Sequence, residues 1–399
     1  MTENRRSFVV LLTFTFFMVT GFEMIMPLVI GHYVGDLGFA ATAVGGALAL
    51  RKFSQQGLAL LGGILADRND VKLLVTLGML MRTVGFAFLA FAQSFPSLLV
   101  AMIFIGLGGV AFETPYQAAI AALTTPENRS RYFSMNNTLV GVASTVGPLL
   151  GALLLVLDFK AVCFGAAGCF FVNAVISLVW LPSIRPKTNP LSVGRSLKIL
   201  KRDRRYIRFV ALMSIFWLAA SQIDITFPLR IRQISGAPES VSWMYSVYAA
   251  VTAILQYPLV SRLLRTHTPR QIIVMGTVVI SAALAITPFI PTTRVFLCLV
   301  AVYTVGMLLA RPNQQSMAIN LAEKGTTGLY LGFNAMSFAV GSGGGAILGG
   351  FLFDMAQIHH TPLLPWAVFC IIGALAVVGF VLSKDLDHER TEGMTPSEN

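Results

Sequence analysis

The chain has 399 residues, of which 55% are hydrophobic and 12% are charged, and its formal net charge is +11. Soluble domains carry about 25% charged residues, so this composition excludes an ordinary soluble domain and predicts a polytopic membrane protein. The basic excess does not indicate nucleic-acid binding, because the Lys and Arg residues concentrate in short segments between apolar stretches, as membrane topology requires.

Apolar stretches long enough to cross a bilayer follow one another along the chain. A spanning helix needs about 20 apolar residues, and twelve such stretches fit the sequence. The helices predicted before a central polar segment cover residues 8–34, 42–66, 71–92, 96–123, 131–156 and 160–182. Those after it cover residues 207–233, 241–264, 271–290, 294–320, 328–354 and 365–383. We therefore expect an all-α membrane protein, whose first apolar run is a retained helix because no small-residue cleavage site follows it.

The distribution of basic residues predicts the orientation. With an even number of helices, one side holds both tails and 21 Lys and Arg residues, and the other side holds four, namely Lys160, Arg230, Arg232 and Arg294. The positive-inside rule then places both termini in the cytoplasm.

Seven charged residues fall well inside predicted helices, where they usually face a cavity or one another. They are Glu23, Arg51, Lys52, Arg82, Glu113, Asp224 and Arg311. Glu23 lies four residues before Pro27, and a buried carboxylate in such a place can exchange protons near neutral pH. Alternatively, Glu23 pairs permanently with Arg51 or Arg82 and never titrates.

Helix 2 presents bases and amides at helical spacing. Arg51 shares a face with Gln55, and Lys52 shares one with Gln56. This pattern favours a polar lining, although Lys52 can instead extend its charge towards the membrane interface.

The hairpin from Gly62 to Lys72 reads GGILADRNDVK and is too short to be anything but a turn at a water face. It resembles the loop between helices 2 and 3 of the major facilitator superfamily, with Asp70 and Val71 departing from the usual pattern. The resemblance implies a cytoplasmic latch that closes the two halves of the molecule, formed by Gly63, Asp67, Arg68 and Lys72.

Glu113 is followed one turn later by Gln117 on the same face. Arg311 lies 198 residues further on, at the matching point of a repeat described below. We expect the two charges on opposite walls of one cavity, where their pairing is either part of the transport cycle or a structural salt bridge.

The fifth predicted helix contains Gly141, Gly147, Pro148 and Gly151. Proline kinks the helix, and the glycines admit a close partner helix. The run resembles the helix-5 signature of the superfamily's proton-driven drug antiporters, with Ala143 in place of one glycine. Those antiporters also carry an arginine on helix 4, where this chain has Met102, so Arg51 or Arg82 is expected to take its part.

The polar segment 183–205 divides the chain. It is either a linker whose charge fixes topology or an amphipathic helix on anionic lipid. We expect a six-helix bundle at 1–182, the linker at 183–205, a second bundle at 206–390 and a tail at 391–399.

The two predicted bundles repeat one another. With an offset of 198, Asn136 falls on Asn334, Gly147 on Gly345 and Gly151 on Gly349; with an offset of 201, the run 23–28 falls on 224–229. Parallel repeats of this kind place a substrate site at mid-membrane between the halves.

The repeat completes the set of candidate residues. Asp224, which matches Glu23, is expected to be a further acid or a substrate contact. The proton-coupling candidates are therefore Glu23, Glu113 and Asp224, and the cavity-lining candidates are Arg51, Gln55, Arg82, Gln117, Asn136, Arg311 and Asn334.

Motifs for other chemistry are weak or missing. The run Gly341–Ala346 mimics a dinucleotide loop but lies in an apolar helix with no preceding strand, and His359-His360 lacks further metal ligands nearby. The cysteines lie inside apolar stretches and are most simply packing residues. We expect no enzyme activity, no cofactor and no metal.

Several longer runs extend the resemblance over nearly the whole chain. They include Leu50–Leu58, Gly78–Arg82, Gly236–Pro238 and Gly350–Asp354, and they look like a type of bacterial multidrug resistance transporter in the same superfamily. The resemblance implies an inner-membrane carrier with alternating access that exports small amphipathic compounds in exchange for protons. Its expected partners are a small-molecule substrate, protons and the lipid bilayer, without nucleic acid, and we expect a monomer. The alternatives are a carrier of this fold for a sugar, amino acid or lipid metabolite, and a membrane receptor or sensor that transports nothing.

Overall fold

The structure is a computed structural model that describes residues 2–58, 69–123, 126–183, 203–263, 266–322 and 327–387. All regular secondary structure in these ranges is helical. The predicted tail at 391–399 and most of the predicted linker lie outside the described residues.

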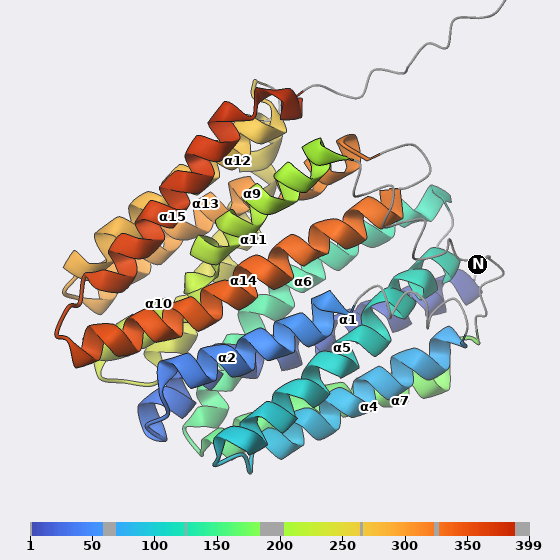
Figure 1. Cartoon of the computed structure of the whole chain (residues 1–399). Helices are drawn as coiled ribbons and strands as arrows, with labels where there is room; N and C mark the ends of the chain where they lie inside the picture. Colours follow the sequence, from blue (N-terminus) through green and yellow to red (C-terminus); the bar gives the residue numbers. More distant parts are fainter. Residues whose placement is uncertain are drawn as a thin grey trace, which may run out of the picture.

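Within the described residues, the first half of the chain contains six helical segments, coloured blue to green in Figure 1. They are α1 (Thr2–Ile30) with η1 (Gly31–Asp36), α2 (Ala41–Lys52) with η2 (Phe53–Gly57), α4 (Val71–Leu89), α5 (Phe95–Leu123), α6 (Pro126–Leu155) and α7 (Phe159–Trp180).

The second half repeats this order. It contains α9 (Arg204–Ala220) with η3 (Ser221–Asp224) and α10 (Thr226–Ser235), α11 (Ser240–Leu263), α12 (Pro269–Ile286) with η4 (Thr287–Phe289), α13 (Thr293–Asn320), α14 (Thr327–Ile358), α15 (Leu364–Leu382) and η5 (Lys384–Asp387).

These helices confirm the predicted all-α membrane protein. Ten segments of the described chain are long and apolar enough to span a membrane. The other two predicted spans correspond to α2 with η2, which runs up to an undescribed segment, and to α11, whose apolar part is Ser240–Leu255. Most boundaries fall within a few residues of the prediction, as for α4 and α15.

One predicted helix differs. The span predicted at 207–233 is interrupted by the 3₁₀ turn Ser221–Asp224 and continues as α10. Ile225, at φ −121° and ψ −72°, leaves the helical conformation. The break therefore lies beside Asp224, a predicted site residue.

Polar caps begin several of the helices. Asp70 accepts a hydrogen bond from the Lys72 amide at 2.9 Å and caps α4, which gives a local role to a residue that departs from the family pattern. Thr268 and Gln271 form a capping box at the start of α12.

Glycine contacts show that the two halves repeat the same packing. A Cβ on Gly78 of α4 would lie 2.7 Å from the carbonyl oxygen of Gly108 on α5. The pair 198 residues later has the same contact, because a Cβ on Gly276 of α12 would lie 2.5 Å from the carbonyl oxygen of Gly306 on α13. Only residues without a side chain allow helices to cross this closely.

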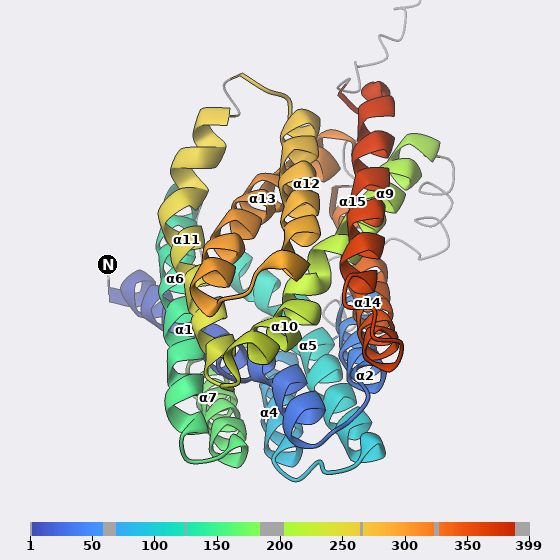
Figure 2. The same ribbon diagram turned by 90° about the vertical axis from the view of Figure 1, so that its left-hand side faces the viewer.

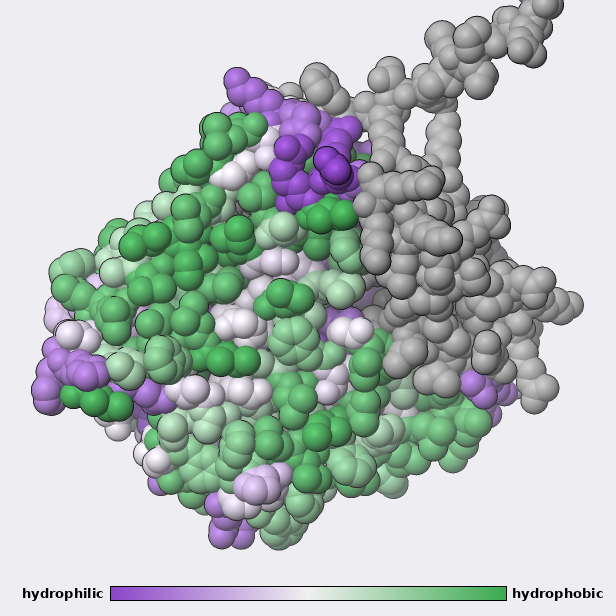
Figure 3. Space-filling view, in the orientation of Figure 1, coloured by the Kyte–Doolittle hydropathy of each residue, from purple (hydrophilic) through white to green (hydrophobic). Residues whose placement is uncertain are grey.

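The halves meet along two pairs of helices. α2 packs on α14, and α6 packs on α11, so each pair joins one helix from each half (Figures 1 and 2). On the face in Figure 3, hydrophobic residues cover most of the described surface and hydrophilic ones gather near its edges. The exposed face of α15 illustrates this, with Ile371, Leu375, Val378 and Leu382 at helical spacing.

Candidate functional site

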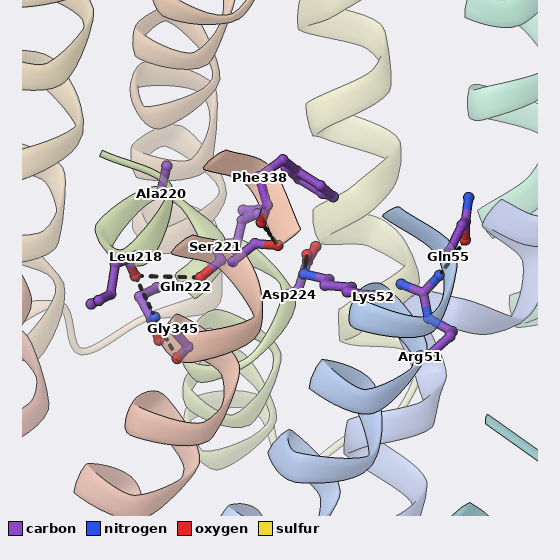
Figure 4. Close-up of polar contacts among 12 residues, drawn as sticks. Arg51, Lys52, Gln55, Leu218, Ala220, Ser221, Gln222, Asp224, Phe338 and Gly345 are labelled. Atoms are coloured by element: carbon purple, nitrogen blue, oxygen red, sulfur yellow. Dashed lines mark hydrogen bonds and ion pairs between the residues drawn. The ribbon is translucent and has the colours of Figure 1, made fainter. Parts of the chain in front are cut away.

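An ion pair joins the two halves where α2 ends and continues as η2. The Lys52 ammonium lies 2.9 Å from the Asp224 carboxylate, and the two side chains point toward one another from α2 and η3 (Figure 4). Lys52 is 5% exposed and Asp224 is 40% exposed. The predicted site residue Asp224 therefore already has a cationic partner from the opposite half.

The broken helix around Asp224 is held by side-chain hydrogen bonds. Gln222 donates to the carbonyl oxygens of Leu218 and Gly345, each at 3.0 Å (Figure 4). The Tyr245 hydroxyl of α11 donates to the Ile223 carbonyl at 3.0 Å. The hydrogen bonds to the Leu218 and Ile223 carbonyls satisfy backbone groups next to the interruption, and the hydrogen bond to Gly345 ties the broken helix to α14.

Glu23 lies on α1 where α6 crosses it closely. A Cβ on Gly147 would lie 2.8 Å from the Glu23 Cβ and 2.9 Å from the Thr20 carbonyl oxygen. The Glu23 side chain is partly buried and interacts electrostatically with Arg51 of its own half and with Asp224 and Arg311 of the other half. The structure thus brings one predicted proton-coupling acid to the junction of the halves.

Glu113 lies deeper in the first half and accepts hydrogen bonds from two consecutive amides. Gln55 donates to its carboxylate at 3.1 Å and Gln56 at 3.5 Å. Both amides belong to η2, a π-helical turn, whose wider winding lets neighbouring side chains reach one acceptor. Arg51 donates to the Gln55 side-chain oxygen at 3.3 Å (Figure 4). Gln55 therefore connects Glu113 with Arg51.

Arg82 lies inside the first half. It is 3% exposed, and its guanidinium lies 4.8 Å from the ring centre of Phe112, 5.4 Å from that of Phe170 and 5.6 Å from that of Phe22. These distances allow cation–π attraction. Its electrostatic partner is Glu113, so this arginine, predicted to line a cavity, is a buried counter-charge among aromatic rings of its own bundle.

Arg311 does not form the expected pair. The structure describes no ion pair between Glu113 and Arg311. Arg311 is exposed on α13 and interacts with Glu23 and with the Tyr248 hydroxyl. The predicted site residue Gln117 lies on α5, and its side chain is outside the described residues.

Asn136 belongs to a polar cluster in the first half. Thr15 of α1 donates to its side-chain oxygen at 2.9 Å, and Thr15 also lies 3.2 Å from the Tyr116 hydroxyl of α5.

Asn334 has the corresponding place in the second half. Gln314 of α13 donates to it at 2.8 Å and to Ser337 at 2.9 Å, and accepts from the Trp217 indole of α9 at 2.9 Å. Each cluster ties together the three helices that correspond in the repeat.

The predicted motifs differ in how much of them is described. In the helix-5 motif, Gly147 and Gly151 pack against α1, and Pro148 lies within α6. A Cβ on Gly141 would lie 3.7 Å from the Cβ of Ala253 on α11. In the gating motif, Lys72 lies in the first turn of α4, and Gly63, Asp67 and Arg68 lie outside the described residues.

The sequence interpretation missed three residues that join the halves. Arg232 of α10 bonds to Asp36 and to the Gly31 carbonyl, and Asp354 of α14 accepts from the amides of Ala41 and Thr42. In the sequence, Arg232 is one of the four bases of its membrane face, and Asp354 belongs to a run that carries the family resemblance. Nothing in the local sequence names their partners.

Comparisons with known proteins agree with this fold. A family model described as the Major Facilitator Superfamily matches residues 11–338 and 225–396. The chain is 34% identical to the multidrug resistance protein MdtH of Aeromonas hydrophila subsp. hydrophila, over 90% of this chain and 91% of that protein. It is 32% identical to MdtH of Photorhabdus laumondii subsp. laumondii, over 96% and 94% of the two chains.

Solved structures support the same fold at lower identity. A POT family transporter in complex with 5-aminolevulinic acid superposes with a TM-score of 0.77 at 15% identity, covering 96% of each chain. The nucleoside transporter NupG superposes with a TM-score of 0.76 at 13% identity, covering 95% of this chain and all of that one.

Proposed function

The chain belongs to the major facilitator superfamily and is a membrane transporter, and from that premise we propose that it exports small amphipathic compounds in exchange for protons. The relatives at 32% to 34% identity are named multidrug resistance proteins, which supports export of such compounds. We place the carrier in the bacterial inner membrane, because the relatives are bacterial, and we propose that it is a monomer. We place both termini in the cytoplasm because the basic residues follow the positive-inside rule.

The proposed mechanism is alternating access between two bundles. The bundles are residues 1–182 and 206–390, connected by the basic segment 183–205 and followed by the tail at 391–399. Their repeated glycine crossings support this division, because each half then packs as a unit. Asp67 and Arg68 would form the cytoplasmic latch that the family resemblance implies.

The position of Glu23 is the observation that carries the proposal. Among the described residues Glu23 has no direct ion pair, yet charges from both halves act on it. Ionised Glu23 attracts Arg311 and repels Asp224 across the junction. Protonation removes both forces, so a proton on Glu23 changes the relative energy of the two arrangements of the halves.

The other two acids are less suited to carry the proton. Asp224 is engaged by Lys52 at 2.9 Å, and Glu113 is held by two amides with Arg82 as its counter-charge. We therefore rank Glu23 first, then Glu113, and assign Asp224 to the contact between halves.

The proton gradient supplies enough energy for this role. Moving one charge across about 100 mV releases about 2.3 kcal/mol, which corresponds to about a fiftyfold bias in a two-state equilibrium.

Flux measurements in proteoliposomes test the proposal. The purified chain is reconstituted with a fluorescent amphipathic dye, and dye movement is followed with and without an imposed pH gradient. We expect the chain to accumulate dye against its gradient only when the pH gradient is present. Glu23→Gln is expected to keep downhill dye exchange and to lose accumulation, because the glutamine cannot carry the proton.

A control separates the proton site from general damage. Glu239→Gln changes an acid in the loop between α10 and α11 and is expected to transport like the unmodified chain. Undiminished pH-driven accumulation by Glu23→Gln would rule out Glu23 as the proton site, and the same result with Glu113→Gln would remove the second candidate. No dye flux by the unmodified chain would reject drug export itself.

A further inference from the structure

The first turn of α2 is capped by a carboxylate from the opposite half. Asp354, near the end of α14, accepts hydrogen bonds from the Ala41 amide at 2.9 Å, the Thr42 amide at 2.7 Å and the Thr42 hydroxyl at 2.6 Å. The N-cap residue of α2 is Ala40, whose side chain has no oxygen to accept these amides. Asp354 therefore does for α2 what a Ser or Asp at position 40 would otherwise do.

Close helix packing makes this contact conditional on the arrangement of the halves. A Cβ on Gly350 of α14 would collide with the Ala41 carbonyl, and one on Gly45 of α2 would collide with the Ala346 carbonyl. The backbones of α2 and α14 thus touch over more than one turn. Asp354 lies one turn beyond Gly350, so it reaches the start of α2 only while this contact is complete.

A second carboxylate, which belongs to the first half, also joins the two halves at this end of the molecule. Asp36 of the first half bonds to Arg232 of the second half and lies 2.9 Å from the His32 ring nitrogen. Arg232 also donates to the Gly31 carbonyl. We call the end that holds loops 37–40, 236–239 and 359–363 the closed end.

The described polar contacts between the halves begin at this end. Among the described residues, every hydrogen bond and ion pair that joins the halves takes its first-half partner from Gly31–Lys52. The contacts thus run from the closed end to the ion pair of Lys52 and Asp224.

We propose that Asp354 is a gating residue, which caps α2 while the closed end is shut and leaves it when that end opens. The proposal rests on the alternating access proposed above, and the positive-inside rule makes the closed end the outer one. Opening removes the carboxylate from the amides at the positive end of the helix, so the strength of this cap sets how often the outer end opens.

The test measures the opening itself, without substrate or pH gradient. Spin labels are placed at Phe91 in the first half and Phe289 in the second, which are 60% and 72% exposed, after replacement of the four native cysteines. Phe91 lies in the turn after α4 and Phe289 ends η4, both at the closed end. Pulsed electron–electron double resonance then reports the populations of short and long distances between the two labels.

Asp354→Asn keeps one acceptor oxygen but loses the negative charge and the second acceptor, so it is expected to raise the ratio of the open to the closed population about two- to fivefold, the range that a charge at a helix end contributes. Asp354→Glu, which keeps the charge, is expected to restore part of the closed population. Asp158→Asn is the matched control, because Asp158 caps α7 within its own half, accepting from the Ala161 amide at 2.6 Å. It is expected to lower the melting temperature without changing the distance populations.

Ala40→Ser separates gating from simple stabilisation. Ala40 has φ −57° and ψ 134°, a conformation in which a serine hydroxyl can cap α2 locally. A local cap competes with Asp354, so this variant is expected to open the end more often while keeping or raising its melting temperature. A purely structural Asp354 predicts no such opening.

The outcomes are distinct. Unchanged distance populations in both Asp354→Asn and Ala40→Ser would overturn the gating role. If Asp354→Asn does not fold, the distance populations of Ala40→Ser still test the gating role. Opening by these variants in a chain that shows no proton-driven flux would keep the gate and reject the proposed antiport.

Discussion

Removing the carboxylate at position 224 is expected to weaken the association of the two halves. Asp224→Asn leaves the Lys52 ammonium, 5% exposed, without its counter-charge at 2.9 Å. A buried cation that loses its partner costs about 3–5 kcal/mol when both groups are fully buried. Asp224→Asn is therefore destabilising mainly because it leaves the buried Lys52 ammonium unpaired.

The partial exposure of Asp224 to solvent reduces this free-energy cost. Two unit charges about 4 Å apart attract by about 4 kcal/mol at an effective dielectric constant of about 20. Because Asp224 is 40% exposed, water already screens part of this attraction. We expect a net loss of about 1–3 kcal/mol for the arrangement in which the halves meet here, which is about a 5- to 150-fold change in population.

The double variant Lys52→Met/Asp224→Asn removes both charges and is expected to recover most of the loss, because no buried charge remains. The spin-label distances at the closed end and the melting temperature in detergent together measure the effect. The control is Asp385→Asn, which breaks an ion pair with Arg208 inside the second half whose members are 46% and 48% exposed. That pair is expected to contribute less than about 1 kcal/mol.

Two results would refute this reasoning. One is a coupling energy between Lys52 and Asp224 below about 0.5 kcal/mol in the double-mutant cycle, which is the scatter expected for independent sites. The other is equal effects of Asp224→Asn and Asp385→Asn on the distance populations. Either result would mean that the ion pair does not hold the halves together.

Further substitutions test the packing and the amide clusters. Gly147→Ala places a Cβ 2.8 Å from the Glu23 Cβ and is expected to destabilise the chain by about 1–3 kcal/mol in thermal unfolding, whereas Gly168→Ala, with nothing within 4 Å, is expected to be neutral or stabilising. Equal melting temperatures for the two would contradict the close crossing of α1 and α6. Gln314→Ala leaves the Trp217 indole and Asn334 without their partner and is expected to cost about 1–3 kcal/mol, while Gln315→Ala at the exposed neighbouring position should change little. A harmless Gln314→Ala would show that the second-half cluster does not stabilise the bundle.

The helices and their repeat could be predicted from the sequence because they depend on local composition. A sufficiently long apolar stretch predicts a spanning helix wherever it occurs, and an offset of 198 matches Gly147 with Gly345 from the sequence alone. In the structure each of these glycines lies against the first helix of its own half, α1 or α9. The repeat of sequence is therefore also a repeat of helix crossings.

The partners of the buried charges could not be predicted in this way. Symmetry placed Glu113 and Arg311 at matching points of the two halves, but matching points are not contacts. Glu113 bonds instead to Gln55 and Gln56, because a π-helical turn brings both amides to one side. The sequence gives no simple signal for such a turn, since it depends on how α2 packs among its neighbours.

The contacts at the closed end could not be predicted from the sequence for a related reason. Asp36, Arg232 and Asp354 lie near helix ends, where charged residues are ordinary in a membrane protein. Their partners come from the other half of the chain, between 196 and 313 positions away. Only the arrangement of the two bundles distinguishes them from other interfacial charges.

The two halves share their helix crossings but differ in the chemistry of their interiors. Both halves have a neutral polar cluster in corresponding helices, formed by Thr15, Tyr116 and Asn136 and by Trp217, Gln314 and Asn334, but the first half also buries Arg51 and Arg82 beside the partly buried Glu113. Amides, hydroxyls and an indole keep their charge state at any physiological pH, so neither neutral cluster responds to a proton.

This asymmetry assigns different roles to the halves under the proposed mechanism. A proton that enters at Glu23 changes the charge of the first half only, and Asp224 and Arg311 are the groups of the second half that respond to it. Because Asp224 is tied to Lys52 and Arg311 has no ion pair among the described residues, the response falls more on Arg311. Coupling then needs no charge change in the second half, since a change in the attraction between Glu23 and Arg311 already favours one arrangement over the other.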